Sequence, residues 1–226
     1  MWYDVSFIII IPGILIALFA QIKLSSTYSK YKKILSASGF TGYDAARKIL
    51  DANGLTDVPV VRQDTGSLSD FYNPKNRTVS LSPDVYSTAS IASIGIAAHE
   101  CGHAIQHKEG YALMRIRNAI VPIVNIATNI SWILMIAGVI FSVFDLTLIG
   151  IVFFASTVIF QLVTLPVETN ASRRALAAIT DLGIVSEEEH IGARKVLSAA
   201  ALTYVAGLLM AILQLLRIIA IFGRRD

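Results

Sequence analysis

Four long apolar segments constrain this chain of 226 residues more than any other feature of its sequence. They cover residues 2–22, 118–142, 146–167 and 198–222, and their only charged side chains are Asp4 and Arg217. Each reaches the roughly 20 mostly apolar residues that a helix needs to cross a bilayer. The segments therefore predict four transmembrane helices. The first is expected to be a retained anchor, because it has neither the basic start nor the cleavage site of a signal peptide.

The composition agrees with an integral, multi-pass protein of the cell membrane whose main partner is the lipid bilayer. Apolar residues make up 54% of the chain and charged residues 15%, against roughly 25% charged residues in a soluble domain. The net charge of +3 is modest, and the basic residues flank the apolar segments, so no nucleic-acid partner is expected. A single cysteine, Cys101, excludes an internal disulfide framework. The sequence leaves the oligomeric state open.

The short connection around Asp145 predicts a hairpin of the second and third spans. Residues 23–117 and 168–197 must then lie on the same side of the membrane, where they can share one site. Ten basic residues flank the spans on this side, whereas the other side has only Arg224 and Arg225. The positive-inside rule therefore places the shared side in the cytoplasm.

Residues 23–117 form a small water-exposed region with both helix and strand patterns. The pattern predicts an amphipathic helix over 41–53, strands over 58–61 and 78–81, and a turn over 73–76. Ser82 and Pro83 are typical of a helix start. A longer helix is predicted from about Thr88 to His107, with a stop at Gly110. Either strand is a candidate edge for holding an extended peptide.

The longer helix contains His99-Glu100-Cys101-Gly102-His103, a match to H-E-x-x-H. Residues four apart lie on one face of a helix, so both imidazoles can bind one zinc ion. Glu100 then projects beside the metal, where it can take a proton from a bound water whose pKa zinc lowers to roughly 7. Gly102 is expected to allow close packing against a neighbouring element. Cys101 is interpreted as a small packed thiol.

A catalytic zinc site needs a third protein ligand. A further histidine after the motif is excluded, because Gln106 and Glu109 stand where the G-x-x-H pattern needs glycine and histidine. The remaining source is a carboxylate on a second helix, and Glu168 is the first one after the hairpin returns to the shared side. The acidic run Glu187 to Glu189 instead fits the first turn of a helix.

These motifs resemble those of the membrane zinc metallopeptidases of the YugP type, distant relatives of the HtpX-type gluzincins. The likeness rests on H-E-C-G-H, on E-T-N-A-S-R-R-A-L from Glu168, and on residues 66–74 and 192–204. It implies one zinc ion per chain on His99, His103 and Glu168, with Glu100 as the base in hydrolysis of protein or peptide substrates. The expected fold is a mostly α integral membrane protein, in which four transmembrane helices carry a small zincin-like α+β catalytic region.

Several further residues are candidates for supporting roles. Ser172 stands where the HtpX pattern has an aspartate that supports a histidine ligand, and Asn170 or Asp70 is an alternative for that role. Arg173, Arg174, Arg194 and Tyr204 are candidates for stabilising the oxyanion of the transition state. For the arginines, charge near phospholipid headgroups is at least as good an interpretation, and Tyr204 fits an interfacial aromatic.

Three other functions are less consistent with the sequence than a peptidase at the membrane surface. A protease that cuts inside the membrane would need an aspartate ligand on a later span, and the later spans have no suitable one. A zinc-binding scaffold without turnover would not need Glu100. A transporter is expected to hold ionisable groups at mid-membrane, and these spans hold almost none.

Overall fold

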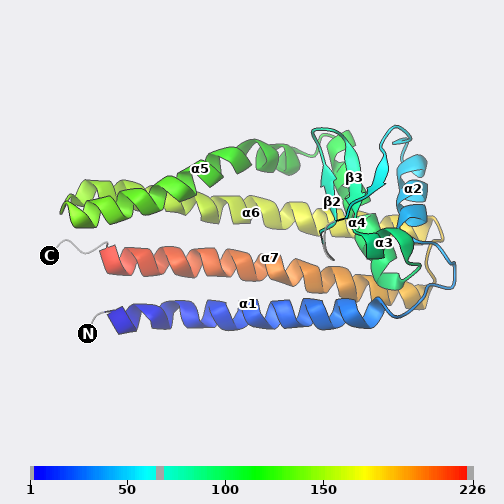
Figure 1. The fold of residues 1–226 in the computed structure, drawn as a ribbon, viewed down its shortest axis with the longest axis horizontal. Coiled ribbons are helices and arrows are strands. Elements are labelled where there is room, and N and C mark those ends of the chain that lie inside the picture. The colour runs from blue at the N-terminus through cyan, green and yellow to red at the C-terminus, as the bar shows by residue number, and fades with distance from the viewer. Residues whose placement is uncertain (1–2, 65–68, 223–226) are drawn as a thin grey trace. The chain divides into compact units, whose positions relative to one another are not determined.

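The computed structural model describes residues 3–64 and 69–222, with side chains from residue 7 onward within these ranges. Parts of the predicted first span, of the family-like segment and of the basic C-terminus lie outside the described residues: Trp2, residues 66–68, Arg224 and Arg225. In chain order the elements are α1 (Tyr3–Tyr31), α2 (Gly42–Ala52), β1 (Val60–Arg62), β2 (Phe71–Asn73), β3 (Thr78–Leu81), α3 (Pro83–Ser87), α4 (Ile91–Lys108), α5 (Ala112–Ile140), α6 (Phe144–Asp181) and α7 (Glu187–Phe222) (Figure 1).

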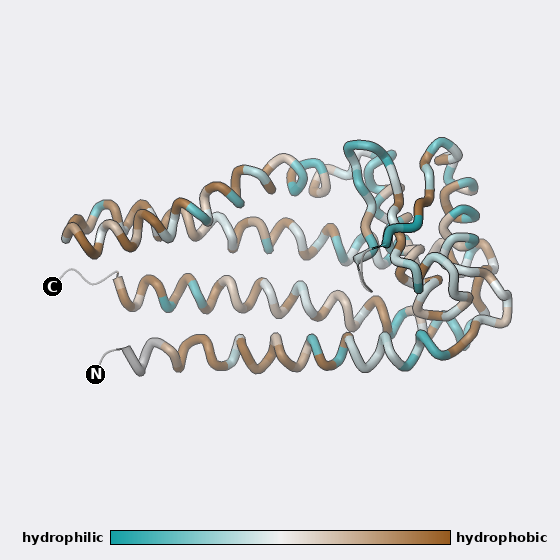
Figure 2. Tube along the Cα trace, viewed as in Figure 1, coloured by the Kyte–Doolittle hydropathy of each residue, from teal (hydrophilic) through white to brown (hydrophobic). Residues whose placement is uncertain are grey.

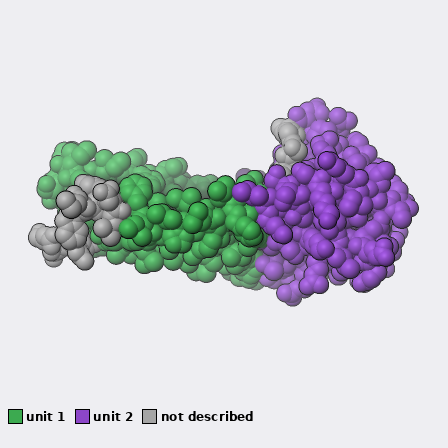
Figure 3. All heavy atoms as spheres, turned by 90° about the horizontal axis from the view of Figure 1, so that it is seen from below, with its two compact units in different colours: residues 1–21, 112–166, 202–226 green, residues 22–111, 167–201 purple. Residues whose placement is uncertain are grey.

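The chain divides into two compact units, coloured separately in Figure 3. The helical unit consists of residues 1–21, 112–166 and 202–226, and the mixed unit consists of residues 22–111 and 167–201. Helices α1, α6 and α7 each contribute residues to both units. The mixed unit holds the three strands and the H-E-x-x-H helix.

Four helices are long and apolar enough to cross a membrane: α1, α5, α6 and α7. Figure 2 shows apolar residues along much of their length. The helices extend beyond the predicted spans, most clearly in α6, which continues past Val167 to Asp181. The reason is that Ala171, Ala175 and Ile179 maintain a buried apolar face at helical spacing after the hydrophobic segment ends.

The predicted hairpin is present between α5 and α6. Its turn closes with a hydrogen bond of 2.8 Å from the Val143 amide to the Gly138 carbonyl. A Cβ atom added at Gly138 would lie 2.2 Å from Thr147 Oγ1, so the two helices approach closely where Gly138 has no side chain. The connection can be short because the two helices already touch at Gly138 and Thr147, close to the turn on either side.

The sheet of the mixed unit has the strand order β1-β3-β2. β3 pairs in parallel with β1 and antiparallel with β2, with Val79 opposite both Val60 and Tyr72. The prediction of strand 78–81 is confirmed, but this strand is central and therefore wrong as a candidate edge. The other predicted strand begins at Val60 rather than Val58. β2 was not predicted, because three residues are too few to show an alternating pattern.

Helix α4 begins and ends at local signals in the sequence. Ser90 caps its start by accepting a hydrogen bond of 3.1 Å from the Ser93 amide. The helix therefore begins at Ile91, three residues later than the predicted start at Thr88. At its end Gly110 has φ of +65°, and the Tyr111 amide donates to the Gln106 carbonyl, so the predicted stop at Gly110 is confirmed. Almost every residue of α4 between these ends is buried.

Candidate metal centre

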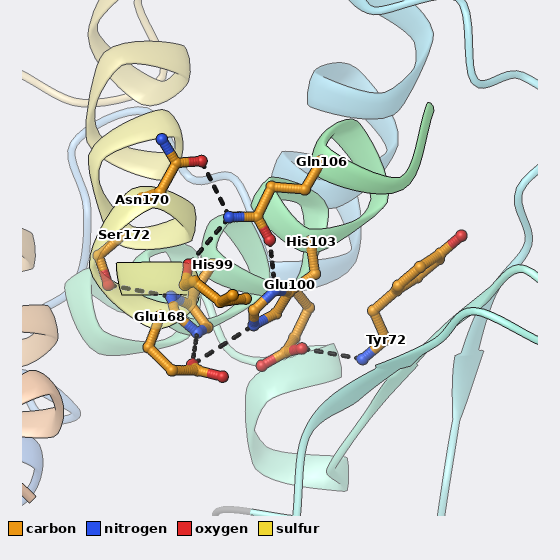
Figure 4. A network of polar contacts seen from close by, with 9 residues as sticks. Tyr72, His99, Glu100, His103, Gln106, Glu168, Asn170 and Ser172 are labelled. Carbon is orange, nitrogen blue, oxygen red and sulfur yellow. Dashed lines mark hydrogen bonds and ion pairs between the residues drawn. The ribbon is translucent and has the colours of Figure 1, made fainter. Parts of the chain in front are cut away.

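Two imidazoles and one carboxylate converge in the mixed unit. His99 and His103 lie one turn apart on α4, and their rings meet edge to face with centroids 4.8 Å apart. Both Nε2 atoms point to Glu168 on α6: Oε2 of Glu168 lies 3.2 Å from Nε2 of His99 and 3.4 Å from Nε2 of His103. One ligand atom from each of the three residues lies within 4.8 Å of the others (Figure 4). The spacing is short enough for a single ion to contact all three.

The opposite ring nitrogens have partners of their own. Nδ1 of His99 lies 3.1 Å from Ser172 Oγ, and Nδ1 of His103 lies 3.0 Å from Gln106 Oε1 (Figure 4). The amide oxygen of Gln106 can only accept, so it fixes the proton of His103 on Nδ1. Ser172 can accept in the same way. Such contacts leave the Nε2 lone pairs available to a metal ion.

Gln106 is completely buried and links α4 to α6. Its Nε2 donates to the Val167 carbonyl and to Asn170 Oδ1, both at 2.9 Å. Asn170 Oδ1 also accepts a hydrogen bond of 2.8 Å from Arg174 Nε, and Arg174 forms an ion pair of 2.7 Å with Glu109. A continuous polar chain therefore runs from an exposed ion pair to the ring of His103.

Glu100 lies on the same helix and is 8% exposed. Its Oε2 accepts a hydrogen bond of 2.8 Å from the backbone amide of Tyr72 on β2 (Figure 4). Among the described residues β2 pairs with β3 on one side only, so this amide belongs to the free edge of the sheet. The same contact fixes the carboxylate and brings the edge strand to the metal centre.

The centre is a negatively charged environment. Burial alone would lower the pKa of His103, but the hydrogen bond to Glu168 and the charges of Glu100 and Glu168 outweigh it and raise the pKa overall. The pKa of Asp70 is raised by burial; hydrogen bonds from Ser82 oppose the rise, and repulsion from Glu100 adds to it. Such a site favours a bound cation, and two imidazoles with one carboxylate are typical ligands of catalytic zinc.

The remaining candidates fall into different surroundings. Asn170 reaches His103 only through Gln106, and Asp70 bonds to Ser82 rather than to a histidine. Arg173 and Arg194 are exposed on α6 and α7, and Tyr204 belongs to the helical unit. Cys101 is buried and donates to the Ala46 carbonyl, and burial raises the pKa of its thiol, which agrees with a packed thiol.

Sequence reasoning missed two residues of this arrangement. Gln106 was considered only as a failed match to a longer motif, although its place one turn after His103 was a signal that it could reach that ring. The role of Tyr72 rests on a backbone amide, which every residue except proline carries, so no residue type could have indicated it.

Comparisons with known proteins agree over nearly the whole chain. A family model described as "Putative neutral zinc metallopeptidase" matches residues 6–223. The "Putative membrane protease YugP" of Bacillus subtilis (strain 168) is 46% identical over 209 residues, which cover 92% of this chain and 92% of that protein. No solved structure matches the chain.

Proposed function

The chain belongs to the family described as "Putative neutral zinc metallopeptidase", and on that premise we propose that it is a zinc-dependent endopeptidase that cuts proteins or peptides at the membrane surface. The family resemblance drawn from its motifs is confirmed. The observation that carries the proposal is the convergence of both histidine Nε2 atoms on Glu168, with Glu100 on the next helical position. The mixed unit is then the zincin-like catalytic region.

The residues present fit one zinc ion per chain. His99, His103 and Glu168 would hold it, which leaves a fourth position open, as a catalytic zinc site requires. Zinc supplies Lewis-acid chemistry: it polarises a carbonyl group and lowers the pKa of water. Ser172 orients the ring of His99 and Gln106 orients the ring of His103, each through the Nδ1 atom.

Glu100 is assigned the proton transfers. The Tyr72 amide occupies its Oε2, so Oε1 is the oxygen that accepts a proton from the attacking water. The same oxygen then donates this proton to the leaving amine of the peptide. Because the hydrogen bond from the Tyr72 amide already orients the carboxylate, little conformational entropy is lost when it reacts.

We assign the binding of the peptide backbone to the free edge of β2. An extended peptide can pair with this edge as an added strand, and the hydrogen bond from the Tyr72 amide places the edge beside Glu100. In the described part of the chain, no hydrogen bond joins β1 to Glu100. The catalytic side is assigned to the cytoplasm, on the distribution of basic residues.

Two substitutions test the proposal and separate its parts. Glu100→Gln removes the base but no ligand, so it should keep zinc and lose hydrolysis by roughly a hundredfold or more. Glu168→Gln should lose both, because only two ligands remain. Zinc content after mild chelation and peptidase activity are measured on the purified full chain.

The matched control is Glu188→Gln, since Glu188 is an exposed glutamate on α7. It should retain both zinc and activity. Glu109 and Glu189 are poorer controls, because the first pairs with Arg174 and the second accepts from the Ala37 and Ser186 amides. Full activity of Glu100→Gln, or wild-type zinc retention by Glu168→Gln, would refute the assignment. Zinc binding by the wild type without any hydrolysis would instead support a scaffold.

A further inference from the structure

A second feature of the mixed unit lies beside the metal centre: a pocket of about 410 Å³ between α6 and α7, here called the α6–α7 pocket. Its volume lies in the range of small-molecule binding sites. Three apolar side chains form part of its lining, and the rest are polar or cationic: Thr169, Ser172, Arg173, His190, Arg194 and Ser198. The pocket borders the centre directly, because Ser172 also contacts His99 and Thr169 follows Glu168.

The charge of the lining selects an anion. Arg173 and Arg194 approach the pocket from different helices, and the lining contains no acidic side chain. Within the described residues, neither guanidinium forms an ion pair or a hydrogen bond. This differs from Arg174, one residue along α6, which is paired with Glu109. Two unpaired guanidinium groups on one pocket, with hydroxyl groups beside them, are suited to a carboxylate or a phosphate.

The position of the pocket favours a carboxylate of a peptide over the phosphate of a lipid. All of its lining residues belong to the mixed unit. Along the helices, Arg173 begins roughly 9 Å beyond the predicted span that ends at Val167, and His190 roughly 12 Å before the span that starts at Ser198. Arg194 begins roughly 6 Å from that span. The headgroup layer is only about 5–7 Å thick on each side. Arg173 and His190 therefore begin beyond this layer, whereas Arg194 begins within it.

The pocket also lies on the side of the centre where a substrate would leave the edge strand. Ser172 and Tyr72 lie on opposite sides of the histidine pair in Figure 4. A peptide that paired with β2 and crossed the histidine pair would continue toward Ser172. We propose that the α6–α7 pocket binds a carboxylate of the peptide substrate, either an acidic side chain or the C-terminal group, through Arg173 and Arg194. This inference rests on the proposed function and names its substrate class.

The test compares peptides that differ in one charge. The peptides carry glutamate or glutamine at each position around the cut, and a free or amidated C-terminus. Binding is measured on zinc-loaded Glu100→Gln protein, and kcat/KM on the wild type. At one position the carboxylate form should be preferred by roughly ten- to hundredfold, as for a hydrogen bond to a charged group. Arg194→Gln should bring this ratio toward one, and Arg194→Glu should favour lysine there.

Lys195→Gln is the matched control, because it removes the same charge from an exposed neighbour on α7 that does not line the pocket. It should keep the wild-type ratio. Absence of any carboxylate preference would overturn the inference. An equal loss on both peptides in Arg194→Gln would also overturn it, since that result indicates contact with the transition state rather than with a substrate carboxylate.

A lipid site would give a different result. In that case the arginine variants would keep the wild-type ratio between the two peptides. Their kcat/KM would, however, no longer differ between nanodiscs of phosphatidylglycerol and nanodiscs of phosphatidylcholine. This result would overturn the inference. Failure of the proposed function is distinguishable from all of these outcomes. If only the proposed function is wrong, the Glu100→Gln protein would still bind the carboxylate peptide preferentially, but the wild type would not cut that peptide.

Discussion

His99 and His103 bind the same carboxylate but have unlike outer partners. His103 is held by Gln106, a buried amide with three contacts of its own, whereas His99 is held by the single hydroxyl of Ser172. Neither partner is charged. The outer contacts therefore set the tautomer and the ring orientation without adding negative charge, and the more extensive support is given to the more deeply buried histidine.

Gln106 is expected to be a positioning residue for zinc. Gln106→Leu keeps a side chain of similar size but leaves His103 Nδ1 without its acceptor, so zinc affinity should fall roughly ten- to hundredfold. The Val167 carbonyl also loses its donor, which should lower the free energy of unfolding by about 1–3 kcal/mol. Competition with a chromophoric chelator gives the zinc Kd, and chemical denaturation gives the stability.

Ser172→Ala should weaken zinc binding less than Gln106→Leu, because it removes one neutral contact and leaves no buried amide network broken. Gln21→Leu, at an exposed glutamine of α1, is the control for the change of side chain and should leave the zinc Kd unchanged. Equal Kd values for Gln106→Leu and the wild type, with the fold intact, would show that the amide is structural only.

At the scale of elements, the site depends on how closely α4 and α6 approach. A Cβ atom at Gly102 would lie 2.5 Å from the Ala171 carbonyl oxygen, well inside contact distance. This contact joins α4, which carries His99 and His103, to α6, which carries Glu168. The expectation that Gly102 permits close packing is confirmed, and the structure adds that its partner is the helix carrying the third carboxylate.

Gly102→Ala should therefore separate the two helices and weaken both the fold and the site. Overpacking of this kind costs about 1–3 kcal/mol, and zinc affinity should fall with it because Glu168 moves away from the histidines. Thermal unfolding with and without zinc measures both effects. In the wild type, zinc should raise the Tm, because it binds only the folded chain.

Gly95 on the same helix provides the comparison. A Cβ atom there would meet Ala193 at 3.6 Å, an ordinary van der Waals contact. Gly95→Ala should be tolerated or should stabilise the chain by up to about 1 kcal/mol, since alanine is the better helix former. A Gly102→Ala variant as stable and as zinc-avid as Gly95→Ala would contradict the importance of the close approach.

At the scale of the whole molecule, four apolar helices and one short hairpin determine which segments can share a compartment. α1 leads into the mixed unit, α5 leaves it, α6 returns to it, and α7 leaves again. With all four helices across the bilayer, both pieces of the mixed unit lie on one side. The buried thiol of Cys101, whose pKa is raised by burial, should react slowly and leave introduced cysteines as the main targets.

Single cysteines at three exposed positions test this topology: Lys33→Cys, Glu188→Cys and Asp145→Cys. The first two should react with an impermeant maleimide from the same side of the membrane, and the third from the other side. In intact cells only Asp145→Cys should be labelled, if the shared side is cytoplasmic. Labelling of Lys33→Cys and Glu188→Cys from opposite sides would remove Glu168 from the centre.

Features that depend on local spacing can be predicted from the amino-acid sequence alone. Apolar length predicts the four helices, and the i, i+4 spacing of His99 and His103 places both rings on one face of α4. Glu168 could be inferred because a hairpin can only return the chain to the side that it left. Each of these three arguments uses one periodicity or one count of spans, and none of them requires knowledge of how side chains pack.

Contacts that depend on how separate elements meet could not be predicted in this way, because they are set by packing in three dimensions. Strand β3 is central because both β1 and β2 pair with it, and the free edge near Glu100 is a strand too short to be predicted. Gln106 reaches His103, Val167 and Asn170 together only because Gly102 lets α4 approach α6. Backbone amides and buried amide side chains have partners set by packing distance, and that distance is a property of two elements rather than of either sequence alone.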